Sequence, residues 1–211
     1  ISMIGLAAED ESIVRRCLGG LGPPDGCERL INDATRSDNL GNVALALWAA
    51  SASGYGEREK ALNRLADMQA DQKAYPTVEV AWALEALSHE QGHRVEDLQR
   101  KLAQRLIQAC NPGSGAFPHA IGDAGSRLRS HVSCFADMVY PILALSTYAT
   151  RWADASALDA ARRYADLPGF ASGEHGLRRR VLHGDPPRGL PGREDPPLHV
   201  LESVHPLGRG L

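Results

Sequence analysis

The chain has 211 residues and a net charge of −3, and it is 43% hydrophobic, 23% charged and 5% aromatic. The hydrophobic fraction supports a packed core, which excludes a wholly disordered chain, and the length fits one domain or two small ones. The small negative charge argues against a nucleic-acid binder that relies on bulk charge. No apolar run is long enough for a membrane-spanning helix, so we expect neither nucleic acid nor membrane as a partner.

The body of the chain, residues 1–168, is expected to form one domain of helical hairpins. Segments that are apolar almost all round are typical of buried helices; they are 40–53, 76–90 and 131–150. Amphipathic segments favour surface helices; they are 57–70, 95–110 and 154–167. Pro76 suits the first turn of its helix and Gly92 its end. Because the two kinds alternate, they predict an all-α array of hairpins with an inner and an outer layer.

The hairpins also share a short sequence repeat, since Ala86-Leu87-Ser88 recurs 58 residues later as Ala144-Leu145-Ser146. The alternation, the loop from Gln108 to Pro118 and the stretch from His131 to Ile142 resemble the α/α-toroid proteins. These include the six-hairpin glycosidases, related polysaccharide lyases and sugar epimerases, and the terpenoid cyclases; the last stretch also resembles an uncharacterised bacterial branch. The resemblance covers about residues 39–168 and implies an incomplete toroid, because a closed ring needs more hairpins than these.

Two inner helices carry a carboxylate and an aromatic residue in equivalent positions. The 58-residue offset maps Glu79 onto Asp137 and Trp82 onto Tyr140. Paired carboxylates flanked by aromatic rings suit acid–base chemistry on sugars. The alternative is that both are ordinary buried acids with arginine or backbone partners.

The remaining candidates come from the segments that precede the inner helices. In such an array the N-termini of the inner helices share one end, where backbone N–H groups favour anionic or polyhydroxylated ligands. The long loop 111–130 reaches this end, although it could equally be a solvated loop. The candidate site residues are Glu79, Asp137, His119 and His131 for acid–base chemistry, and Tyr75, Trp82, Tyr140, Arg127, Arg129 and Asp38 for substrate binding.

A different motif, His89-Glu90-Gln91-Gly92-His93, matches the H-E-x-x-H pattern of zinc peptidases. It falls where an inner helix should turn into an outer one, whereas zinc peptidases place both histidines on one helix. We therefore expect a carbohydrate-active protein of hydrolase, lyase or epimerase type, without metal or cofactor. Alternatives are a non-catalytic helical-repeat scaffold that binds a protein, and a zinc metallopeptidase. Either a saccharide or another small molecule is the expected ligand, and an oligomer could complete the ring.

The cysteines and the tail bear on the origin of the chain. Four cysteines without a C-x-x-C pair predict free thiols, and with no signal-peptide pattern they favour a cytoplasmic location. The chain begins at Ile1 rather than Met, as a fragment would. Residues 169–211 hold 8 of the 21 glycines and 6 of the 13 prolines. This irregular tail is expected to be disordered or of non-native sequence, such as a frameshift in GC-rich DNA would produce.

Overall fold

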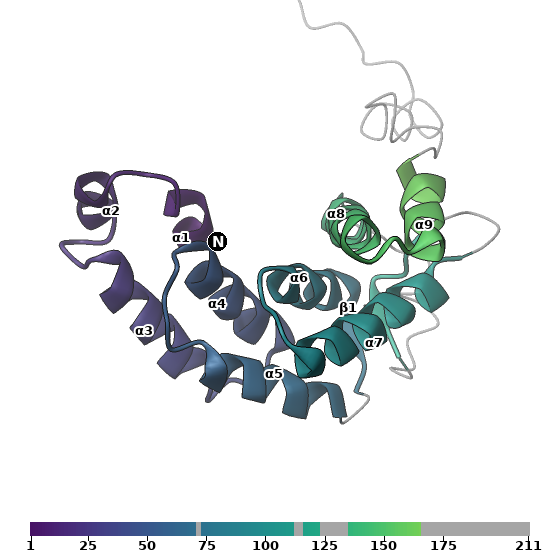
Figure 1. Ribbon diagram of the computed structural model, residues 1–211, viewed down its shortest axis with the longest axis horizontal. Helices are drawn as coiled ribbons and strands as arrows, with labels where there is room; N and C mark the ends of the chain where they lie inside the picture. Colours follow the sequence, from purple (N-terminus) through teal and green to yellow (C-terminus); the bar gives the residue numbers. More distant parts are fainter. Residues whose placement is uncertain (71–72, 112–115, 123–134, 166–211) are drawn as a thin grey trace, which may run out of the picture. The chain divides into compact units, whose positions relative to one another are not determined.

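The computed structural model describes residues 1–70, 73–111, 116–122 and 135–165, all of them within one unit, Ile1–Gly173. This part of the chain is mostly helical (Figure 1). The helices are α1 (Ser2–Leu6), α2 (Glu11–Cys17), α3 (Pro23–Ala34), α4 (Leu40–Ala52), α5 (Glu59–Ala70), α6 (Thr77–Ser88), α7 (His93–Ala109), α8 (Phe135–Trp152) and α9 (Ala155–Ala165). Two short strands, β1 (Tyr75–Pro76) and β2 (Ala120–Ile121), pair antiparallel. The predicted tail, 169–211, lies outside the described residues.

The three predicted hairpins are confirmed as α4–α5, α6–α7 and α8–α9, with the members of each pair packed together. The apolar helices form a row in which α6 contacts both α4 and α8. In Figure 1, α5 and α7 lie together on one side of this row. Two predicted boundaries were wrong. Pro76 belongs to β1 and caps α6 rather than opening it, and α6 ends at Ser88, so that Gly92, with φ 113°, caps the start of α7 instead.

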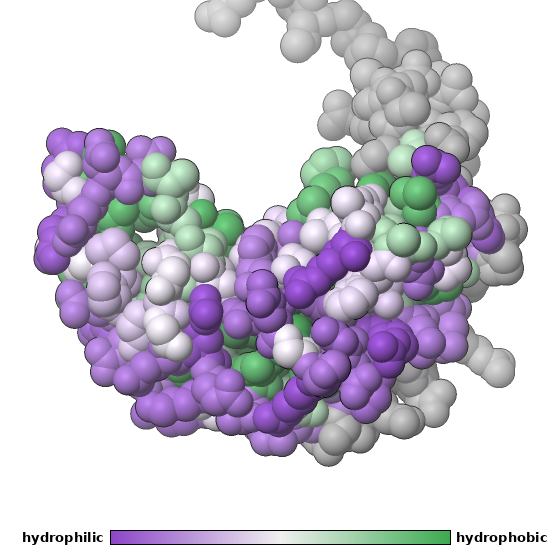
Figure 2. Space-filling model, viewed as in Figure 1, coloured by the Kyte–Doolittle hydropathy of each residue, from purple (hydrophilic) through white to green (hydrophobic). Residues whose placement is uncertain are grey.

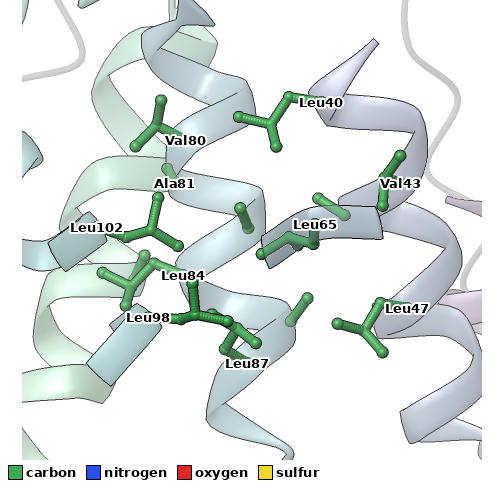
Figure 3. Close-up of a cluster of buried hydrophobic side chains, with 14 of the residues drawn as sticks. Leu40, Val43, Leu47, Leu65, Val80, Ala81, Leu84, Leu87, Leu98 and Leu102 are labelled. Atoms are coloured by element: carbon green, nitrogen blue, oxygen red, sulfur yellow. The ribbon is translucent and has the colours of Figure 1, made fainter. Parts of the chain in front are cut away.

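The core lies where the outer helices press their apolar stripes against the row. Figure 3 shows Leu65 of α5 and Leu98 and Leu102 of α7 beside leucines and valines of α4 and α6. These side chains are almost completely buried, and alanines at Ala44, Ala81 and Ala83 let the inner helices approach closely. The visible face over α5 and α7 is mainly hydrophilic (Figure 2). The amphipathic pattern therefore sets which helices lie outside.

The structure adds α1, α2 and α3 before the first hairpin, which the sequence patterns left unassigned. Helix α3 opens with Pro23, whose missing N–H costs nothing at a helix start. It buries Cys27 and Ile31, and both α1 and α3 contact α4. Cys17 is exposed and Cys27 is buried, and both are free thiols, as predicted. Burial raises the pKa of Cys27, which keeps it protonated and unreactive.

The helices of the inner layer, α4, α6 and α8, run parallel. The first turn of α6 bonds to the first turn of α4 through Glu79, and the turn after α6 contacts the last turns of α4 through Glu90 and Ser51. Trp82 and Tyr140 pair α6 with α8, and the last turn of α8 bonds to the last turn of α6 through Arg151. All three helices consequently begin at one end and finish at the other. No helix among the described residues is both long and apolar enough to cross a membrane.

Candidate functional site at the N-terminal end of the inner layer

A histidine and a carboxylate that the sequence predicts as site residues meet at the N-terminal end of the inner layer. His119 Nδ1 lies 2.8 Å from Asp137 Oδ2, in the first turn of α8. Asp137 is completely buried, whereas the His119 side chain is 38% exposed. A carboxylate oxygen accepts from Nδ1–H and thereby fixes the ring tautomer, which leaves Nε2 as the basic nitrogen. The pair thus has the arrangement of a positioned proton acceptor.

The segment that carries His119 is fixed to α6 by backbone and side-chain bonds. Tyr75 pairs with Ile121 and Pro76 with Ala120 in the β1–β2 ladder. The Thr77 N–H donates to His119 O at 2.9 Å, and the Thr77 hydroxyl donates to Pro118 O. Thr77, which the sequence patterns did not identify, is completely buried. Its place directly after Pro76 was the available signal, because the first N–H groups of a helix need partners outside it.

Glu79 has a different set of partners from its counterpart Asp137. Its Oε1 accepts from Asn39 Nδ2 at 3.0 Å and its Oε2 from the Gly41 N–H at 3.1 Å. Asn39 is also the N-cap of α4, since its Oδ1 accepts from the Asn42 N–H at 2.8 Å. A carboxylate at a helix N-terminus is stabilised by the free N–H groups and by the helix dipole. Glu79 therefore helps to cap the neighbouring helix, which is the backbone-partner alternative that the sequence left open.

The aromatic candidates also differ from one another in their surroundings. Trp82 and Tyr140 are half-buried and meet edge to face, with ring centroids 5.3 Å apart, so the 58-residue offset correctly places them side by side. Tyr75 is instead buried in the core, where its hydroxyl donates to Met68 O at 3.2 Å. Arg105 also lies over its ring, 5.6 Å from the centroid, and the predicted part of Tyr75 in substrate binding stays a prediction. Asp38 is exposed and pairs with Arg64 at 2.6 Å.

Three of the candidate residues, His131, Arg127 and Arg129, lie outside the described residues, so their predicted roles stay predictions.

The H-E-x-x-H motif spans a turn. His89 caps the end of α6, Gly92 has φ 113°, and His93 opens α7. His89 stacks on Trp48, while Glu90 accepts from the Ser51 hydroxyl and pairs with Arg58 at 3.3 Å. The two histidines are thus not one turn apart on a single helix, as the zinc-peptidase geometry requires. Among the described residues no group of three histidines, cysteines or acids is placed to hold a metal ion.

Comparisons of the chain with protein-family models, curated proteins and solved structures give no match. The fold and the site define an all-α array of packed helical hairpins with a histidine–aspartate pair at one end.

Proposed function

We propose that this chain is a carbohydrate-active protein, of hydrolase, lyase or epimerase type, on an incomplete α/α toroid. The observation that carries the proposal is the His119–Asp137 pair, in which a half-exposed ring is held at 2.8 Å by a fully buried carboxylate. Sugar chemistry of each of these types needs a proton moved to or from the ligand, and a positioned imidazole serves that purpose. The first turns of α6 and α8 lie at the same end and suit polar or anionic ligand groups.

In this proposal the proton-transfer group is His119 rather than Asp137. Asp137 has no exposed surface, so it acts on the ligand only through the ring that it orients. His119 Nε2 takes the proton from the ligand and later returns it. Glu79 keeps α4 and α6 in register, while Trp82 and Tyr140 supply apolar surface one turn further along. The arginines 127 and 129 and His131 remain candidates for anionic groups and for assistance.

The test is a panel of neutral and uronate-containing oligosaccharides incubated with the native chain and with His119→Ala, Asp137→Asn and Glu79→Gln. We expect His119→Ala to lower turnover by about 10²–10⁴-fold, and Asp137→Asn to lower it and to shift its pH profile. His93→Ala is the matched control, because the His93 side chain is fully exposed on α7. Undiminished turnover in both the His119 and Asp137 variants would remove the proposal.

A second candidate, a scaffold that binds a protein or another copy of the chain, is favoured by one observation. Apolar side chains on α8 are exposed, Phe135 by 71%, Leu143 by 42% and Trp152 by 39%. Figure 2 shows green surface in the region of α8. If a second copy completes the row there, sedimentation will show concentration-dependent association that Leu143→Asp weakens and that Arg162→Asp, on exposed α9 surface, does not. A chain that stays monomeric at all concentrations contradicts the oligomer.

A further inference from the structure

The C-terminal end of the inner layer carries an open groove between α6 and α8. It has a volume of about 490 Å³ and is lined by Ser88, Ser146, Thr147, Thr150 and Arg151. Sites for small-molecule ligands commonly have volumes in this range. None of these residues belongs to the histidine–aspartate site, which lies at the opposite end of the same helices.

The lining of the groove offers hydrogen-bond acceptors more than donors. The Ser88 hydroxyl donates to Glu85 O at 2.6 Å, and the Thr150 hydroxyl donates to Ser146 O at 2.8 Å. Each hydroxyl has used its hydrogen, which leaves its oxygen lone pairs to accept from a ligand. Arg151, the cation of the groove, donates to Ser88 O and Glu90 O beyond the end of α6. The groove therefore complements a ligand that brings hydrogen-bond donors.

A buried carboxyl lies next to the groove, beside Thr147. Glu85 is only 7% exposed, and its enclosed Oε2 has no hydrogen-bond partner among the described residues. Its Oε1 lies 3.9 Å from His89 Nε2. Burial raises the pKa of Glu85 above its ordinary value, and the neighbouring Thr147 hydroxyl and His89 ring lower it in part. Burying a carboxyl oxygen that lacks a partner costs free energy unless a hydrogen-bond donor or a cation pairs with it.

We propose that the groove binds a small hydroxylated molecule through a primary ammonium group, which pairs with Glu85 beside Thr147. The ammonium has three donors for the carboxylate and for the serine and threonine oxygens. The C-terminal ends of α6 and α8 favour a cation through their dipoles. Arg151 keeps its positive charge, and its guanidinium is directed to the carbonyl oxygens of Ser88 and Glu90 beyond the end of α6. This binding site does not depend on the function proposed above.

The test uses two probes that differ by one group, glucosamine and glucose, titrated calorimetrically into the native chain. We expect saturable binding of glucosamine and binding of glucose that is weaker by about tenfold or more, the change that one lost ion pair brings. Glu85→Gln should weaken glucosamine binding to the level of glucose, whereas Glu9→Gln, an exposed acid on the connection after α1, should leave it unchanged. Circular dichroism checks that each variant folds.

A second readout uses the native chain alone. At a pH between the ordinary glutamate pKa and the raised pKa of Glu85, an ammonium group that ionises Glu85 expels a proton, so the heat of glucosamine binding there should depend on the ionisation enthalpy of the buffer. His89, the C-cap of α6, lies 3.9 Å from Glu85, and Arg151 of α8 lines the groove. The release should persist in His89→Gln. Equal binding of glucose, retained binding in Glu85→Gln or binding without proton release overturns the proposal, as does the absence of saturable glucosamine binding.

Discussion

The two ends of the inner layer give a buried carboxyl different surroundings. At the N-terminal end, Asp137 is completely buried and holds the half-exposed ring of His119 at 2.8 Å. At the C-terminal end, Glu85 is nearly as buried, but the histidine nearest to it in the ion-pair geometry, His89, lies 3.9 Å from its Oε1. The helices are the same, so the difference comes from what the ends supply. One end has the free backbone N–H groups of the helices and the segment that carries His119. The other end has free carbonyl oxygens and hydroxyl groups.

This contrast separates a preorganised site from an unfilled one. The N-terminal end supplies the partner of its carboxylate from its own chain, which suits a group that must keep one orientation. The C-terminal end gives its carboxyl a more distant histidine, 3.9 Å away, which suits a site that a positively charged ligand completes. Variants at the two ends should therefore differ in the size and the sign of their effects on stability.

The largest effect is expected from Asp137→Ala. It removes a fully buried carboxylate and leaves His119 without its partner, a loss that costs about 3 kcal/mol of unfolding free energy in comparable buried pairs. Urea denaturation at neutral pH measures it. Glu85→Ala is the matched variant at the other end, and its loss should be smaller because the carboxyl that it removes is incompletely paired. A larger loss for Glu85→Ala would break the contrast.

The next effect tests how Glu79 holds α4 and α6 together. A Cβ added at Gly41 would lie 2.9 Å from Glu79 Cγ and 3.2 Å from its Cδ. Gly41→Ala should therefore destabilise the chain by about 1–3 kcal/mol, as overpacking does, despite the better helix propensity of alanine. Gly5→Ala is the control, since nothing lies within 4 Å of its added Cβ. Combining Gly41→Ala with Glu79→Ala should recover part of the loss, and strictly additive losses would show that the two residues are not coupled.

The sequence predicts the hairpins well because burial leaves a periodic trace. Leu98 and Leu102 recur on one face of α7 while the residues between them are polar, and both are buried as expected. The 58-residue offset even places Trp82 against Tyr140. Helix α3 was overlooked although Pro23-Pro24 is a helix-start signal, because its short apolar stripe is interrupted by charged residues.

Hydrogen bonds and ion pairs between polar groups that are distant in sequence leave no periodic pattern in the sequence. His119 and Asp137 are 18 residues apart in sequence, and the β1–β2 pairing and Thr77 hold the His119 segment against α6, the neighbour of α8. Glu85 stands in an apolar run between Leu84 and Ala86, which was a signal for a buried carboxyl, but its surroundings come from α8. The predicted pairing of Glu79 with Asp137 as equivalent groups illustrates this limit, because equal positions in the repeat have unequal neighbours.

A smaller effect should come from Glu85→Gln, and it depends on pH. Because burial raises the pKa of Glu85 in the folded state, the folded chain holds its proton more tightly than the unfolded chain. Unfolding free energy should then fall as pH rises from the ordinary glutamate pKa through the raised one. Glu85→Gln lacks this fall. Above that pH window its unfolding free energy should therefore equal or exceed that of the native chain, by on the order of 1 kcal/mol. Urea titrations across the window decide the sign.

The smallest effect, Asp154→Ala, should have the opposite dependence on pH at the same end of the inner layer. Asp154 caps α9, accepting from the Ser156 N–H at 2.9 Å and the Ala157 N–H at 3.0 Å. The hydrogen bond from the Ser156 hydroxyl, together with these backbone bonds, lowers the pKa of Asp154. Its stabilisation is therefore present above the ordinary aspartate pKa and is lost as pH falls. Removing the cap should cost about 0.5–1 kcal/mol at neutral pH and nothing in acid. The stability contributions of the two carboxyls would then depend on pH in opposite directions, because hydrogen bonds to the ionised form dominate at Asp154 and burial dominates at Glu85. A cost of Asp154→Ala that persists unchanged in acid would show that the cap acts without its charge.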